Sequence, residues 1–418
     1  MTITTVTAQR LLGKVRVSGA KNSALRMLAA SILTAEPVCL SESPNGLSDM
    51  KVHIEMLEVL GKSCGVSGPE LVITESSILD GKLNWEGRSI RNTLLILGAL
   101  TTRLGYGSVP LPGGCALGDR KYDLHVKLLE SMGARVWEEN GFLCAEAIGR
   151  LKGADIRLPF RSTGATENAI LAGTLAQGTT TIWNPHIRPE ILDLVDLLKK
   201  MGADITVHGQ QCIVVEGQEG LHGAKHTVCP DNMEAITWAI GSVITGGEVE
   251  IERFPLSHLE TPLIFLRESG MRFFTGPDSV IVSGGRPLPV DISTGPYPGI
   301  NSDMQPLFAV YGACSAGKSR IIDLRFPGRF DYAQELAKMG AKISFQGDIL
   351  EIEGGSELIG ADVIATDLRA GAALYLAGLT ANGETKIHDS WQIERGYENF
   401  YQKLSALNCP PVDAQSLP

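Results

Sequence analysis

The sequence has no apolar run long enough to cross a membrane. A membrane-spanning helix needs roughly 20 consecutive apolar residues, and no stretch of the 418-residue chain approaches that length. The segment Met1–Arg10 is polar and rich in Thr, and it lacks the basic-then-apolar order of a signal peptide. We therefore expect no membrane insertion.

Disulfide and metal-binding patterns are also missing. The eight cysteines are scattered singly and none forms a CxxC pair, which argues against a zinc knuckle and a disulfide framework and favours the reducing cytoplasm. No group of His, Asp and Glu residues has metal-ligand spacing. We expect neither a metal nor another cofactor.

The sequence also lacks an excess of positive charge. The formal net charge is -10, whereas a protein that binds nucleic acid or an anionic membrane surface usually has a basic face. An acidic enzyme can still hold an anionic substrate where Arg and Lys residues converge. The hydrophobic share of 44% is typical of a globular protein with sizeable cores.

What the chain does contain is an internal repeat. An apolar, helix-like stretch that ends in a Gly turn recurs about every 70 residues, at Gly61, Gly133, Gly202, Gly270, Gly340 and, with Asn in place of Gly, Asn408. A second apolar helix and a β-branched run precede each turn, and a hairpin-like segment follows it. Gly or Asn just past a helix is typical of a left-handed C-cap. The pattern predicts six copies of one α/β unit.

Six units are too many for one core, so we expect two domains of three units each. The predicted boundary lies near Val228–Asp231. The first domain is then 21–229, and the second is 1–20 plus 230–418. The N-terminal strand, through about Gly19, could pair with either half.

Six spaced motifs carry a family resemblance that covers essentially the whole chain. They are VSGAKNSAL (Val17–Leu25), LPGGCALGDR (Leu111–Arg120), STGATENAILAGTLAQGTT (Ser162–Thr180), SDMQ (Ser302–Gln305), TDLRAGAALYLAG (Thr366–Gly378) and ERGYEN (Glu394–Asn399). In these motifs the chain resembles the bacterial UDP-N-acetylglucosamine enolpyruvyl transferases, which belong to the EPSP synthase family.

The resemblance implies both a fold and an activity. The fold has two inside-out α/β domains, each made of three repeats of a βαβαββ-type unit. The activity is that of a carboxyvinyl transferase: the enolpyruvyl group of phosphoenolpyruvate moves to the 3-hydroxyl of UDP-N-acetylglucosamine and phosphate is released. This is the first committed step of peptidoglycan synthesis. The oligomeric state stays open.

Cys115 is the first residue that the chemistry singles out. It follows Gly113 and Gly114 in a glycine-rich loop that ends at Arg120, where exposure and a lowered thiol pKa are plausible. A small buried cysteine is the ordinary alternative. The resemblance implies that Cys115 donates the proton to phosphoenolpyruvate and is the target of fosfomycin.

Lys21 and Asn22 begin a helix directly after Gly19 and Ala20. A Lys beside unsatisfied backbone N–H groups suits an anion, although a solvated surface Lys is the common case. The resemblance implies that Lys21, as a catalytic residue, binds the donor phosphate and that Asn22 holds the acceptor sugar.

The donor's phosphate and carboxylate also require fixed guanidinium groups, which grip planar anions in a bidentate manner. Matching motif positions supply them at Arg91, Arg120, Arg369 and Arg395. The resemblance places Arg395 among the catalytic residues. A surface salt bridge is the ordinary role of any single Arg.

Asp303 matches the family carboxylate that acts on the acceptor hydroxyl, and an Asp that only caps a helix is the alternative. Asp367 and Glu394 are interpreted as partners that orient Arg369 and Arg395. His125 lies at an apolar helical spacing, which favours a structural role.

The resemblance assigns the acceptor to a larger set, and here the match is weakest. The residues implied to contact the acceptor are Asn22, Arg120, Asp123, Leu124, Ser162, Thr163, Gly164, Asp303 and Arg325. The departures from the family are Phe160 for Lys, Asn232 for Arg, Ile187 with Arg188 for Arg-Glu, Arg325 for an aliphatic residue, Pro327 with Gly328 for Glu-Asn, and Gln392 for His. Transfer to a different nucleotide in a specialised pathway is therefore the alternative.

Overall fold

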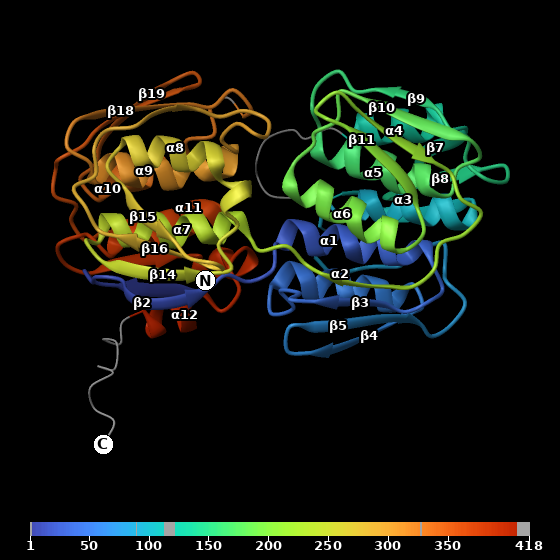
Figure 1. The fold of residues 1–418 in the computed structure, drawn as a ribbon, viewed down its shortest axis with the longest axis horizontal. Helices are drawn as coiled ribbons and strands as arrows, with labels where there is room; N and C mark the ends of the chain where they lie inside the picture. The colour runs from blue at the N-terminus through green and yellow to red at the C-terminus, as the bar shows by residue number, and fades with distance from the viewer. Residues whose placement is uncertain (1, 89, 113–121, 327, 408–418) are drawn as a thin grey trace. The chain divides into compact units, whose positions relative to one another are not determined.

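The computed structural model describes the chain except for residues 1, 89, 113–121, 327 and 408–418. The chain forms two compact units. We call Gly19–Cys229 the first unit, and Met1–Ser18 together with Pro230–Pro418 the second unit. Each is described by itself (Figure 1).

The described residues of the first unit form three sheets, in the strand orders β13-β3-β5-β4, β6-β8-β7 and β11-β12-β10-β9. Their strands are β3 (Val38–Ser41), β4 (Lys62–Ser67), β5 (Glu70–Glu75), β6 (Tyr106–Pro110), β7 (Ala134–Glu139), β8 (Phe142–Ala147), β9 (Asp155–Arg157), β10 (Thr179–Trp183), β11 (Asp204–His208), β12 (Cys212–Glu216) and β13 (Ala224–Thr227). The helices are α1 (Lys21–Ala30), η1 (Ser31–Leu33), α2 (Ser48–Val59), α3 (Thr93–Leu104), α4 (Asp123–Ser131), α5 (Thr163–Thr174) and α6 (Pro189–Lys200).

The described residues of the second unit form three more sheets, β15-β16-β14-β2, β17-β18-β20-β19 and β1-β22-β21. Their strands are β1 (Ile3–Val6), β2 (Leu12–Arg16), β14 (Glu248–Glu252), β15 (Arg272–Thr275), β16 (Ser279–Ser283), β17 (Asp291–Ser293), β18 (Lys318–Ile322), β19 (Lys342–Gln346), β20 (Ile349–Glu353), β21 (Asp362–Ile364) and β22 (Thr385–His388). The helices are α7 (Asn232–Ile244), η2 (Leu256–His258), α8 (Glu260–Glu268), η3 (Ser302–Met304), α9 (Gln305–Cys314), α10 (Asp331–Lys338), α11 (Leu368–Gly378), η4 (Ser390–Arg395) and α12 (Phe400–Ala406).

The predicted βαβαββ unit is confirmed. In the complete copies β9-α5-β10-α6-β11-β12 and β17-α9-β18-α10-β19-β20, the first two strands are parallel and the hairpin pairs antiparallel with the second. The five glycines that follow the second helix in each of the first five repeats have positive φ, between 86° at Gly340 and 106° at Gly61. This is the left-handed C-cap that the sequence predicted. Asn408 lies outside the described residues.

Three copies take a strand from a distant part of the chain. β13 pairs parallel with β3, and β2 pairs parallel with β14. β1 pairs antiparallel with β22, in the place that a hairpin strand has in the other copies. The N-terminal strands, which the sequence left without a partner, therefore both belong to the second unit.

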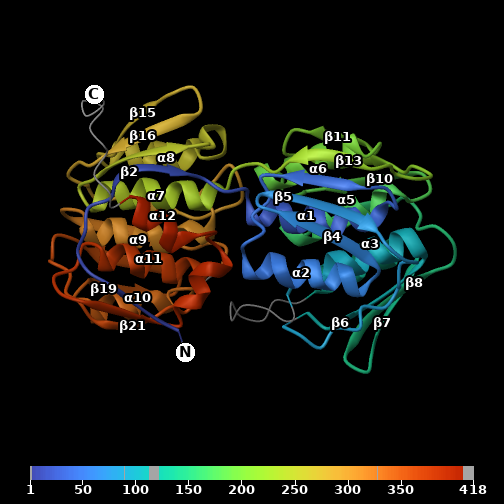
Figure 2. The same ribbon diagram turned by 90° about the horizontal axis from the view of Figure 1, so that it is seen from below.

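In each unit the helices gather inside and the sheets lie outside (Figures 1 and 2). The helices that precede the second strand of each repeat are buried along nearly their whole length: α1, α3 and α5 in the first unit, and α7, α9 and α11 in the second. The alternate helices are amphipathic, with one buried face. This arrangement gives each unit its own apolar core.

Two buried histidines of the first unit make its stability pH-dependent. His53 and His125 each lie 3.1 Å from an Asn Nδ2, of Asn92 and Asn168 respectively. Burial, with a smaller contribution from a nearby Arg, lowers the pKa of each ring to about 3. The unfolded chain binds these protons near pH 6.5 and the folded chain does not, so stability is complete above pH 6.5 and is lost as the pH falls toward 3.

We expect the free energy of unfolding to fall below pH 6.5 by about 1.4 kcal/mol per pH unit for each histidine. Urea unfolding at pH 7.5 and 5.5 measures this loss. His125→Asn should reduce the pH-dependent loss, and the exposed control His208→Asn should not. Equal pH dependence in the two variants would contradict the assignment.

Candidate functional site

The N-terminal ends of the three central helices of the first unit lie together. Asn92, the N-cap of α3, donates from Nδ2 to the carbonyl of Leu25 in α1 at 2.7 Å. Arg26 of α1 pairs with Glu167 of α5 at 2.8 Å. Helix N-termini carry unpaired N–H groups and partial positive charge. This end of the unit therefore favours an anion.

The second unit has the same arrangement. Asp231 and Asp367 are the N-caps of α7 and α11, and η3 leads into α9. The charges of Asp231 and Asp303 both act on Arg369, at the start of α11. The N-terminal ends of α7, α9 and α11 thus also lie close to one another.

Lys21 is the first residue of α1, and its side chain is buried in a small charge cluster. Its Nζ lies 2.6 Å from Asp49 Oδ2, while Arg88 pairs with the other oxygen of Asp49. Two cations therefore share the carboxylate of Asp49. An ammonium group at the N-terminus of α1 suits a phosphate group.

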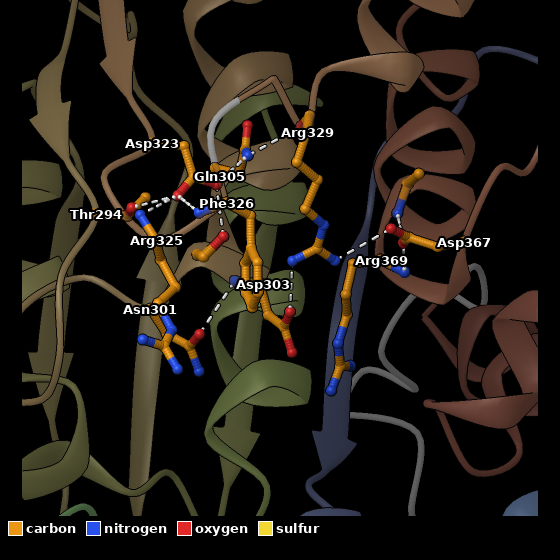
Figure 3. A network of polar contacts seen from close by, with 12 residues as sticks. Thr294, Asn301, Asp303, Gln305, Asp323, Arg325, Phe326, Arg329, Asp367 and Arg369 are labelled. Atoms are coloured by element: carbon orange, nitrogen blue, oxygen red, sulfur yellow. Dashed lines mark hydrogen bonds and ion pairs between the residues drawn. The ribbon is translucent and has the colours of Figure 1, made fainter. Parts of the chain in front are cut away.

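A second charge cluster surrounds Arg329, just before α10 (Figure 3). The guanidinium donates to Asp303 Oδ1 at 2.8 Å and to Asp367 Oδ2 at 3.1 Å. Burial acts to lower the pKa of Arg329, but the two carboxylates together raise it above its ordinary value. The side chain of Asp303 is about 30% exposed, so it can still meet a ligand.

The alternative role for Asp303 was that of a helix cap, but another residue caps η3. The N-cap of η3 is Asn301, whose side-chain oxygen accepts from the backbone N–H of Asp303 at 3.1 Å. The carboxylate of Asp303 instead pairs with Arg329.

Arg369 is fully buried, and Tyr397 lies beneath it with its ring centroid 5.0 Å from the guanidinium. Nε and Nη1 of Arg369 have no hydrogen-bond partner among the described residues. Burial acts to lower its pKa, and Tyr397, Asp231 and Asp303 raise it overall. A buried cation with unpaired donors is costly unless an anion meets it.

Arg395 ends η4 and is held by its own helix. Its Nη1 donates to Gln392 Oε1 at 2.8 Å, and Trp391 lies with its ring 5.7 Å away. Glu394 is exposed. Asp367 pairs with Arg329 and caps α11 through the backbone of Arg369 and Ala370.

His125 lies between the segments predicted to contact the acceptor. Its Nε2 would be 3.1 Å from a Cβ added to Gly164, and Arg91 is near enough to lower its pKa. Ser162 caps α5 by accepting from Ala165 N at 3.4 Å. Buried and bonded to Asn168, His125 has the structural role that its spacing indicated.

The other predicted residues of the first unit lie on three of its helices, α1, α4 and α5. Asp123 begins α4 and is exposed, and Leu124 packs against the core. Thr163 Oγ1 lies 2.8 Å from His186 Nδ1. Asn22 follows Lys21 in α1 and is half-buried. Cys115 and Arg120 lie outside the described residues.

The positions that depart from the family differ in exposure. Phe160 is 49% exposed and Arg325 is also exposed, with its guanidinium 5.6 Å from the Phe326 ring. Burial lowers the pKa of Arg325, against the charge of Asp323. Asn232 is buried at the start of α7, and Ile187 is buried in the core of the first unit. Gln392 holds Arg395, as described above.

Sequence reasoning missed Arg329. It stands directly after Pro327 and Gly328, which depart from the family pair Glu-Asn. The available signal was an Arg immediately before a helix, in a loop bounded by Asp323 and Asp331. The structure shows that it joins two carboxylates.

Comparison with known proteins identifies the family. The model of the family described as EPSP synthase (3-phosphoshikimate 1-carboxyvinyltransferase) matches residues 6–404. The chain therefore belongs to the EPSP synthase family of enolpyruvyl (carboxyvinyl) transferases. The resemblance and the enzyme class inferred from the sequence are confirmed.

Similarity to curated proteins is high over nearly the full length. The chain is 43% identical to UDP-N-acetylglucosamine 1-carboxyvinyltransferase 2 of Carboxydothermus hydrogenoformans, over 96% of each chain. It is 40% identical to UDP-N-acetylglucosamine 1-carboxyvinyltransferase of a Caulobacter species, over 95% of this chain and 93% of that protein.

Solved structures share the fold. The enolpyruvyl transferase NikO from Streptomyces tendae matches with a TM-score of 0.87 and 26% identity, over 97% of each chain. EPSP synthase from Acinetobacter baumannii matches with a TM-score of 0.73 and 20% identity, over 98% of each chain. The second likeness shows the fold alone.

The described residues contain neither a candidate membrane span nor a candidate metal site. None of their helices combines the length and apolarity needed to cross a membrane. Within the same residues, no group of three or more His, Cys, Asp and Glu side chains could hold a metal ion.

Proposed function

We propose that this protein transfers the enolpyruvyl group of phosphoenolpyruvate to the 3-hydroxyl of UDP-N-acetylglucosamine and releases phosphate. The reaction would take place in the cytoplasm as the first committed step of peptidoglycan synthesis. One observation carries the proposal: 43% identity, over 96% of both chains, to a protein named for this activity.

The donor is a small molecule with a phosphate and a carboxylate. Lys21, at the N-terminus of α1 and paired with the Asp49 that Arg88 also contacts, is the proposed phosphate ligand. Arg369, whose Nε and Nη1 have no partner among the described residues, is a further proposed ligand, and Arg91, Arg120 and Arg395 complete the proposed set. Fixed cations of this kind lower the energy of charge that develops on the leaving phosphate.

The chemistry requires one proton donor and one base. Cys115 is the proposed donor of a proton to the methylene carbon of phosphoenolpyruvate, which makes the adjacent carbon electrophilic. Asp303 is the proposed base that accepts the proton of the sugar hydroxyl as its oxygen attacks that carbon. The ion pair with Arg329 at 2.8 Å fixes the orientation of the Asp303 carboxylate.

The acceptor is assigned to Asn22, Arg120, Asp123, Leu124, Ser162, Thr163, Gly164, Asp303 and Arg325. The capped N-terminus of α5, which begins at Thr163, supports this assignment because it offers N–H groups to a diphosphate. Phosphate release from phosphoenolpyruvate, measured with a panel of nucleotides and nucleotide sugars, tests it. No turnover with millimolar UDP-N-acetylglucosamine would overturn the proposed acceptor.

The second candidate is the same transfer to a different nucleotide. The observation that favours it is Arg325, an exposed cation whose backbone N–H is held by the buried Asp323 at 2.9 Å. In that case UDP-N-acetylglucosamine fails in the panel while another nucleotide supports phosphate release. The enolpyruvyl transfer itself is common to both candidates.

We expect the acceptor to bind more weakly than in relatives with a Lys at position 160. Loss of one charge-assisted hydrogen bond lowers affinity roughly ten- to hundredfold. Phe160→Lys should therefore lower the KM for the acceptor by about tenfold, with the KM for phosphoenolpyruvate unchanged. Phe274→Lys, which adds the same charge at a phenylalanine that is 63% exposed, is the control. Equal effects of the two variants would contradict a local role for position 160.

A further inference from the structure

A buried carboxylate that the proposed chemistry does not use lies behind Asp303. Asp323 follows β18 directly and has no exposed surface. It accepts five hydrogen bonds, from Thr294 Oγ1, Ser302 Oγ, Gln305 Nε2, Arg325 N and Phe326 N. A buried carboxylate is costly unless its lone pairs are bonded, and these donors meet that need (Figure 3).

One oxygen of Asp323 holds the segment that carries Asp303. Ser302 Oγ and Gln305 Nε2 each donate to Oδ2 at 2.6 Å. Ser302 is the residue before Asp303 in η3, and Gln305 is the first residue of α9. The side chains of a residue before Asp303 and a residue after it are therefore hydrogen-bonded to a single buried oxygen. These bonds hold the backbone on both sides of Asp303.

The same group also holds the loop that carries Arg329. Oδ1 accepts from the backbone N–H groups of Arg325 and Phe326, each at 2.9 Å. Gln305 Nε2 donates in addition to the carbonyl of Arg329 at 3.1 Å, and Gln305 Oε1 accepts from Tyr332 at 2.5 Å. Asp323 thus links the two segments whose side chains form the Asp303–Arg329 pair.

We propose that Asp323 is a positioning residue for the reaction, which fixes the carboxylate of Asp303 and the guanidinium of Arg329 in one geometry. The inference rests on the proposed function, in which Asp303 is the base. A base must reach the proton it takes within about 2.6–3.2 Å, and a displacement of about 1 Å can lower the rate roughly a hundredfold. A rigid connection to a buried group provides that precision.

Two variants of similar size separate positioning from general stability. Ser302→Ala and Thr294→Val each remove one hydroxyl that donates to Asp323, and both residues are buried. Ser302 is next to Asp303, whereas Thr294 follows β17. We expect Ser302→Ala to lower kcat roughly ten- to hundredfold, with both KM values within about threefold of wild type. Thr294→Val should lower the unfolding temperature about as much as Ser302→Ala does. Its kcat should stay within about twofold of wild type.

Asp323→Asn extends the test, because both oxygens of Asp323 accept hydrogen bonds and the Nδ2 of an amide cannot accept. The kcat of Asp323→Asn should fall at least as far as that of Ser302→Ala. Ser302→Thr restores the hydroxyl that Ser302→Ala removes, so it should recover most of the wild-type activity. Equal kcat losses in Ser302→Ala and Thr294→Val would overturn the inference, even if Asp323→Asn does not fold. A wild-type enzyme inactive with phosphoenolpyruvate and every acceptor would instead overturn the proposed function.

Discussion

Asp303→Ala is expected to lower kcat roughly 10²–10⁴-fold, the contribution typical of a general acid or base. The reason is that the variant leaves no carboxylate to accept the proton of the acceptor hydroxyl, while the proposed donor ligands Lys21 and Arg395 are untouched. The KM for phosphoenolpyruvate should therefore stay near its wild-type value. Steady-state phosphate release with both substrates varied gives kcat and the two KM values.

The alternative to be excluded is that Asp303 acts only as the structural partner of Arg329. In that case Asp303→Ala would lower the unfolding temperature and leave kcat nearly unchanged, since Arg329 keeps Asp367. Asp331→Ala is a matched control, because Asp331 is an exposed carboxylate at the start of α10 in the same unit. Near wild-type turnover in both variants would remove Asp303 from the chemistry.

Fosfomycin is expected to alkylate Cys115 and no other cysteine. The thiolate is the reactive form of cysteine, and burial suppresses it. Burial raises the pKa of Cys64 to about 12 and that of Cys314 to about 11, and it raises the pKa of Cys229 well above the ordinary value. Several of the competing thiols are thus unreactive near neutral pH. Peptide mapping by mass spectrometry should find one label per chain, formed faster with the acceptor present.

Two variants control this experiment. Cys115→Asp keeps a proton donor, so it should retain turnover while labelling disappears. Cys39→Ser, which removes a half-buried thiol of β3, should leave labelling complete. A label on any other cysteine, or none on the wild type, would refute the assignment of Cys115.

The fold was predictable to a large extent, because its signals are local. The C-cap glycines recur at a fixed interval, and each has the positive φ that a residue with a Cβ rarely adopts. The apolar helix that the sequence shows before each β-branched run is the central helix of the repeat, and it is buried along nearly its whole length. In these elements local preference and global packing agree, so the repeat of one α/β unit could be predicted from the residues, while the βαβαββ order came from the family resemblance.

The pairing of strands that are distant in the sequence was not predictable in the same way. β1, β2 and β13 pair with strands far away in the sequence. A four- or five-residue strand has no local feature that selects its partner. The choice depends on which sheet edge remains unpaired after the rest of the unit has packed.

For the functional residues, the sequence by itself determined the candidates: motif residues such as Lys21, Cys115, Asp303 and Arg369 in their order along the chain. Only the tertiary structure decided their partners. Lys21 shares the carboxylate of Asp49 with Arg88. Arg329 joins Asp303 to Asp367. Asp323 holds the segments that carry Asp303 and Arg329. The physical reason is that motifs record residue type and spacing, whereas charge pairs and buried hydrogen bonds form between segments that only the packed helices bring together.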